Sequence, residues 1–139
     1  MSIGISRGTL DAILADVAMD GGRERCGLLF GGNGRVDAAQ PVANVHPDPA
    51  RFFELDPAAL IAAHRHARAG GAVMIGHYHS HPHGAPVPSV EDAACAQQGG
   101  LVWIIVAQGV ARAWRSTGQP GTRPEARFAP LSITIFDGP

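Results

Sequence analysis

Apolar spacing, capping residues and terminating glycines predict helices in three parts of the chain. Leu10, Ile13 and Val17 share one face of a helical repeat and predict an amphipathic helix. A second helix is predicted to begin at Asp56, which can cap it, and to end before a pair of glycines. The helices predicted in this way cover residues 6–18, 56–69 and 89–98.

Six other segments are short apolar runs bounded by glycine, asparagine or proline, as is typical of β-strands. A Gly-Asn-Gly turn at residues 32–34 predicts a hairpin between the first two. The strands are predicted at residues 26–30, 36–42, 72–75, 101–107, 110–115 and 128–136, with loops at 82–88 and 117–124. This order predicts a mixed α/β (α+β) fold in which helices flank a single curved β-sheet.

Composition narrows the class of protein. The chain has 139 residues, 45% of them hydrophobic, and we expect residues 1–139 to form one domain. The formal net charge is −1 and no basic run is interleaved with aromatic residues, so no nucleic-acid partner is expected. No signal peptide or membrane-spanning stretch is recognisable, and we expect a cytoplasmic protein with no membrane partner. Cys26 and Cys95 are interpreted as reduced, buried cysteines, and an oligomer is left possible.

Four of the seven histidines alternate along seven consecutive positions. Side chains two residues apart on a strand point to one face, so a His-x-His pair can bind one metal ion. The pair could be His77 with His79 or His79 with His81, and spacing alone does not choose between them. Asp92, in the first turn of the third predicted helix, can supply a carboxylate. Two histidines and one carboxylate leave a coordination position for water, as a catalytic zinc site requires.

Each of these residues also has a plain structural interpretation. The histidine cluster could lie on the surface and bind metal only incidentally. Ser89 stands three residues before Asp92, at the spacing of a capping box, and is expected to cap its helix whatever else it does. Glu24, between Arg23 and Arg25, could be an ion-paired surface residue.

Two separated motifs resemble the JAMM/MPN+ family of zinc metallopeptidases. The family pattern of His-Ser-His-Pro followed by Ser-x-x-Asp matches residues 79–82 and 89–92. Ten residues separate the second histidine from the aspartate, which is the family spacing. An upstream family segment, Glu-x-Cys-Gly-Leu-Leu, matches residues 24–29. The resemblance covers most of the chain, about residues 10–114.

The resemblance implies a role for each site residue. His79, His81 and Asp92 would bind one zinc ion per chain. Glu24 would be the general base that takes a proton from the metal-bound water and passes it to the leaving amine. Ser89 would help to hold the developing oxyanion.

The resemblance also implies a fold and a reaction. The fold would be the cytidine-deaminase-like MPN sandwich, and Asn44 and His46 would lie in a loop that lines the substrate groove. The reaction would be zinc-dependent hydrolysis of the peptide or isopeptide bond after the C-terminal Gly-Gly tail of a ubiquitin-like, sulfur-carrier protein. The chain has no long insertions near the site and so resembles the compact stand-alone prokaryotic members of the family, and this resemblance is what implies the substrate. The alternatives are a catalytically inactive MPN interaction scaffold and a JAMM peptidase acting on cell-wall or phage-tail peptides.

Overall fold

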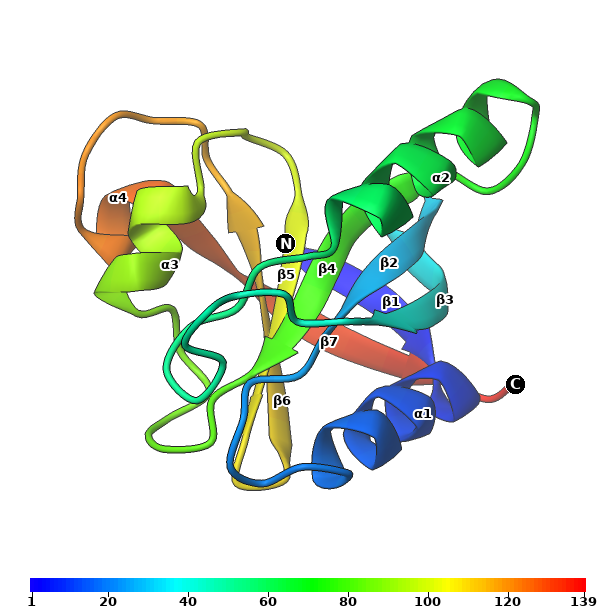
Figure 1. Cartoon of the computed structure of the whole chain (residues 1–139). Helices are drawn as coiled ribbons and strands as arrows, with labels where there is room; N and C mark the ends of the chain where they lie inside the picture. Colours follow the sequence, from blue (N-terminus) through cyan, green and yellow to red (C-terminus); the bar gives the residue numbers. More distant parts are fainter.

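The structure is a computed structural model that describes all residues from Met1 to Pro139. It contains four helices and seven strands (Figure 1). In chain order these are β1 (Ser2–Ser6), α1 (Arg7–Ala18), β2 (Cys26–Gly32), β3 (Arg35–Val42), α2 (Pro57–Arg68), β4 (Met74–Ser80), α3 (Val90–Cys95), β5 (Val102–Ala107), β6 (Val110–Ser116), α4 (Pro124–Arg127) and β7 (Phe128–Phe136).

All seven strands belong to one strongly curved, mixed sheet. Its spatial order is β1-β3-β2-β4-β5-β6-β7, and it closes on itself because β1 pairs with both β3 and β7. Strands β4 and β5 are parallel neighbours, so their C-terminal ends lie at the same end of the sheet. The predicted α+β fold with one curved sheet is confirmed, whereas its closure was not predicted.

Helices pack on both faces of the sheet, and this explains the apolar pattern of its central strands. Helix α1 covers the largest core cluster, which includes Leu10, Ile13 and Ile104. On the opposite face of the sheet, Ala63 of α2 packs with Leu28 and Phe30, and Ala93 of α3 packs in a cluster with Trp103. Strand β5 is therefore buried along its whole length, as a continuous apolar run predicts.

Four elements differ from the sequence prediction. Strand β1 was missed, because Ile3 and Ile5 are too few to mark a strand and its partners lie far along the chain. Strand β4 begins at Met74 and contains His77 and His79, whereas the strand was predicted to end at residue 75. Helix α3 ends at Cys95, three residues before its predicted end, and the four-residue helix α4 was not predicted. None of the helices has the length and apolar character needed to cross a membrane.

Candidate metal centre

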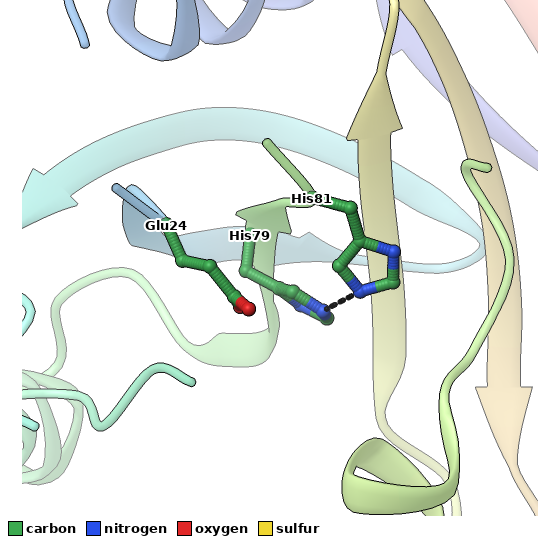
Figure 2. Close-up of side chains that lie close together, drawn as sticks. All are labelled: Glu24, His79 and His81. Carbon is green, nitrogen blue, oxygen red and sulfur yellow. Dashed lines mark hydrogen bonds between the residues drawn. The ribbon is translucent and has the colours of Figure 1, made fainter. Parts of the chain in front are cut away.

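Strand β4 delivers two histidines to one end of the sheet. Side-chain alternation directs His79 to one face and Tyr78 to the core under α1. The strand pairing continues beyond β4, since the amide of His81 donates to the Val106 carbonyl at 2.8 Å. The two imidazoles face each other with their Nε2 atoms 3.1 Å apart (Figure 2).

The N-terminal cap of α3 places a carboxylate against both rings. The Ser89 hydroxyl accepts from the Asp92 amide at 3.0 Å, and Oδ2 of Asp92 accepts from the Ser89 amide at 2.9 Å. The predicted capping box is thus confirmed. Asp92 Oδ1 lies 3.1 Å from His79 Nε2, and its Oδ2 lies 3.2 Å from His81 Nε2. Burial opposes ionisation of Asp92, but the two histidines and the Ser89 amide outweigh it and lower its pKa.

The three side chains form the geometry that a zinc ion needs. Tetrahedral zinc with ligands at about 2.0–2.1 Å separates neighbouring donor atoms by roughly 3.3 Å. The observed separations of 3.1 Å and 3.2 Å are close to that value. The Nδ1 atom of His81 lies 2.9 Å from the Ala85 carbonyl, so as the protonated nitrogen it donates there and leaves the Nε2 lone pair free. The residues therefore fit a zinc ion, and the structure brings together His79 and His81 rather than His77.

Glu24 lies beside this triad. Its carboxylate is within 4.8 Å of the ligand nitrogens of both His79 and His81, and the three side chains converge (Figure 2). It is 7% exposed, and Arg23 and Arg25 pair instead with Asp20 and Asp16. The ion-paired surface interpretation of Glu24 is therefore wrong. Burial raises the pKa of Glu24 to about 8, against the lowering effect of His81.

Longer-range contacts hold the segment that carries Glu24. Arg25 makes two hydrogen bonds with Ser80, which lies between His79 and His81 in the sequence. The Arg25 amide donates to Ser80 Oγ, and the Arg25 carbonyl accepts from the Ser80 amide, each at 2.9 Å. In Figure 1 this segment, between α1 and β2, runs beside the end of β4. The Arg25 guanidinium donates twice to Asp16 Oδ1 of α1, at 2.7 Å and 3.1 Å. The Tyr78 hydroxyl donates to the other oxygen of Asp16 at 2.6 Å.

The glycine of the upstream motif has a packing role. A Cβ atom at Gly27 would overlap the ring of Tyr78 and crowd the Gln40 carbonyl. Glycine at this position lets Tyr78 lie flat against β2 and reach Asp16. Gly27 therefore allows Tyr78 to bind Asp16, the same residue that binds the Arg25 guanidinium.

Ser89 also faces the open side of the site. It lines a cavity of about 330 Å³ together with Glu24, His81 and Arg51. Its oxygen accepts the Asp92 amide, so the hydroxyl hydrogen is not used by the cap. Ser89 can therefore donate a hydrogen bond into this cavity.

Two contributors to the site carried weak or no signals in the sequence. The ring of Phe53 stacks on His79, with centroids 4.2 Å apart and planes inclined by 16°. Asn44 lines a cavity of about 370 Å³ beside Glu24, and it also makes four hydrogen bonds between Glu24 and the segments around His46 and Phe53. Only the tertiary structure reveals these contacts, because an isolated Phe or Asn has no distinguishing pattern.

The remaining histidine and cysteine candidates lie outside the triad. His77 is buried edge-on against Trp103, and burial lowers its pKa to about 3. Cys26 is buried as predicted, with its thiol 3.7 Å from the Val42 carbonyl. Cys95 is exposed, and its interpretation as a buried cysteine is wrong because α3 turns that position outward.

Comparisons with known proteins identify the family of the chain. The family model "Prokaryotic homologs of the JAB domain" matches residues 6–117. A desampylase of Haloferax volcanii is 39% identical over 84 residues, which are 59% of this chain and 60% of the relative. A probable TtuB-protein conjugate cleaving protease of Thermus thermophilus is 34% identical over 88 residues, 63% of this chain and 59% of the relative. Tail tip assembly protein K of Escherichia phage N15 is 33% identical over 98 residues, 70% of this chain and 38% of the relative.

Solved structures share the fold. A protein of Desulfitobacterium hafniense aligns with a TM-score of 0.80 and 24% identity, over 98% of this chain and 94% of the other. A JAB1/MPN domain protein of Archaeoglobus fulgidus aligns with a TM-score of 0.57 and 21% identity, over 96% and 97% of the two chains. The chain spans less than two thirds of the length of the curated relatives named above. With a matching family model over most of its length, the same fold and both family motifs assembled at one site, the chain belongs to the prokaryotic homologues of the JAB domain, a branch of the JAMM/MPN family.

Proposed function

We propose that this protein is a zinc-dependent hydrolase that cleaves the bond after the C-terminal Gly-Gly tail of a ubiquitin-like protein. The observation that carries the proposal is the triad of His79, His81 and Asp92, whose donor atoms lie at zinc-ligand separations beside a buried glutamate. An interaction scaffold has no need of such a set. The complete triad with Glu24 therefore argues against the catalytically inactive alternative.

Each residue of the chain has a distinct chemical task in this proposal. Bound zinc would supply a Lewis acid that lowers the pKa of water and polarises a carbonyl group. Glu24 accepts the proton of the attacking water and delivers it to the leaving amine, because its carboxylate lies within 4.8 Å of the ligand atoms of both histidines. The Ser89 hydroxyl donates to the oxygen that becomes negative as the carbonyl is attacked. The ring of Phe53 excludes water from one side of His79 and holds its plane.

The substrate class rests on the relatives and on the shape of the site. The Thermus thermophilus relative is named as a protease that cleaves protein conjugates, and its similarity covers 63% of this chain. The loop between β4 and α3 runs past the site from Pro82 to Pro88, and the cavity beside Glu24 measures about 330 Å³. A tail that ends in two glycines has no side chains to clash with walls so close to the metal position. An isopeptide or peptide bond after Gly-Gly is therefore the proposed target.

The test combines metal content with cleavage. Purified protein is expected to hold about one zinc per chain. It should also cleave a fusion in which the C-terminal Gly-Gly tail of a ubiquitin-like protein is joined to a second protein, and so release that second protein. A chelator should abolish release and zinc should restore it. A matched fusion ending in Ala-Ala should be cut poorly. Protein that takes up no zinc when it is supplied would overturn the proposal.

A second candidate is favoured by one comparison. The similarity to a tail tip assembly protein of a phage covers 70% of this chain. This similarity favours, as the second candidate, a peptidase that acts on phage-tail peptides. The same fusion assay separates the two, since a peptidase of that kind would not require a Gly-Gly tail. Equal cleavage of Gly-Gly and Ala-Ala fusions would favour the second candidate.

A further inference from the structure

Asn44, just beyond the end of β3, joins three segments of the chain at the metal site. Its Nδ2 donates to the carbonyl of Glu24 at 2.8 Å and to the carbonyl of Phe52 at 3.0 Å. Its Oδ1 accepts from the amide of His46 at 3.1 Å and from the amide of Glu54 at 3.0 Å. Both donor hydrogens and both acceptor positions of this one amide are thus used.

One side of this junction is the general base of the proposed reaction. The peptide unit that follows Glu24 is bound through its carbonyl by Asn44. The amide of Glu24 itself donates to the Pro49 carbonyl at 2.7 Å. Glu24 precedes β2 and has no strand partner, so these two bonds replace the strand pairing that would otherwise fix its backbone.

The other side of the junction is the segment that supports a metal-site histidine. Asn44 binds Phe52 and Glu54, the two neighbours of Phe53. The backbone bridge between Asn44 and Leu55 reinforces this register. Phe53, clamped between them, stacks on the ring of His79.

We infer that Asn44 is a positioning residue that holds the backbone of Glu24 and the Phe53 segment in fixed register with the metal-site histidines. The inference rests on the proposed function and adds to it. Asn44 does not touch the reacting atoms; it acts through Glu24. A carboxylate displaced by about 1 Å from the attacking water costs up to about 10²-fold in rate, which gives such a clamp a measurable effect.

The chemistry of the clamp requires an amide. The substitution Asn44→Asp would keep both acceptor contacts to His46 and Glu54 but would set an oxygen against two carbonyls. The substitution Asn44→Ala would remove all four bonds. The two variants therefore share only the loss of the bonds to Glu24 and Phe52.

The experiment measures turnover of the Gly-Gly fusion, zinc content and amide hydrogen exchange in both variants. Asn33, exposed in the β2–β3 turn, provides the matched control Asn33→Asp with the same change of charge. We expect kcat to fall about 10²-fold in both Asn44 variants, with KM and zinc content close to those of the wild type. Exchange at the amides of His46 and Glu54 should quicken in Asn44→Ala and stay slow in Asn44→Asp.

A second comparison separates positioning from a general structural role. In a Glu24→Gln background, Asn44→Asp should reduce the residual rate little further, because the residue through which it acts is already inactive. The same fold-loss in both backgrounds, or a loss that matches the fraction of zinc-free protein, would overturn the inference. Wild-type protein that binds zinc but cuts no fusion would instead overturn the proposed function, and this inference with it.

Discussion

Asp92 and Glu24 are both carboxylates of one site, yet the regions that hold them differ in construction and in electrostatics. They are similarly buried, at 5% and 7% exposure. Asp92 lies against two imidazoles and the Ser89 amide, so its pKa is lowered. Glu24 accepts no hydrogen bond from an amide or a guanidinium, so burial dominates and raises its pKa to about 8. Neighbouring groups, not residue type, thus separate the pKa values of the two carboxylates, in line with the proposed roles of Asp92 as a metal ligand and Glu24 as the general base.

The two regions are also fixed over different distances along the chain. Asp92 is oriented by a capping box that spans Ser89 to Asp92, within a single turn. Glu24 is fixed by Asn44 and Pro49, and through Arg25 by Ser80 and Asp16. The first region can be recognised from four consecutive residues, whereas the second exists only when distant segments meet.

The largest expected effect is the loss of the metal on substitution of Asp92. Asp92→Ala should lower zinc affinity by more than about 10²-fold and abolish cleavage, because only two of the three proposed ligands remain. Zinc content after dialysis and competition with a chromogenic chelator measure this. Asp11→Ala, on the exposed face of α1, is the matched control and should keep its zinc. Stoichiometric zinc in Asp92→Ala would contradict the proposed ligand set.

Glu24→Gln should separate chemistry from metal binding. We expect one zinc per chain, as in the wild type, and a fall in kcat of about 10²–10⁴-fold, because the amide cannot accept the proton. Metal analysis and single-turnover cleavage of the fusion measure both quantities. Glu125→Gln, on exposed α4, should behave as the wild type. If Glu24→Gln loses zinc, then Glu24 is a ligand and the contrast with Asp92 fails.

Ser89 tests whether a cap residue also acts in the reaction. Ser89→Ala removes both the cap and the hydroxyl, whereas Ser89→Gly removes the hydroxyl at little cost to the cap. Both should lower kcat by about 10²-fold, with Ser89→Ala alone losing about 1 kcal/mol in the free energy of unfolding. Cleavage rates and urea denaturation distinguish the two contributions. A Ser89→Gly variant with near wild-type kcat would leave Ser89 as a helix cap only.

The smallest effect concerns the stability of the metal-free protein as a function of pH. Glu24 has a pKa raised from 4.5 to about 8 in the folded state, so the folded state binds more protons than the unfolded state between these values. Ionisation therefore opposes folding progressively as pH rises from 4.5 to 8, and Glu24→Gln removes that cost. With a chelator present, we expect the variant to become progressively more stable than the wild type as pH rises from 4.5 to about 8, with almost no difference below pH 4.5. A difference that does not change with pH would show that Glu24 is not held in a raised-pKa environment.

Local signals account for the parts of the fold and site that were predicted. The helices that begin after Ser6 and Asp56 have side-chain caps, and the capping box at Ser89 is present. The Gly-Asn-Gly turn joins β2 and β3 as a hairpin. The extent of α3 was overestimated, because its alanines favour a helix but the chain turns at Ala96, whose carbonyl accepts from Arg127. That contact comes from α4 and cannot be read locally.

The sequence by itself determined the elements whose signals lie within a few residues: the main helices, the apolar central strands and the motif that contains His79, His81 and Asp92. Only the tertiary structure decided the closure of the sheet through β1, the stacking of Phe53 on His79 and the clamp that Asn44 places on Glu24. The physical reason is that caps and side-chain periodicity act along a short stretch of chain. Burial, ring stacking and hydrogen bonds between distant segments arise when the chain folds, and these set the pKa of Glu24 and the position of its carboxylate.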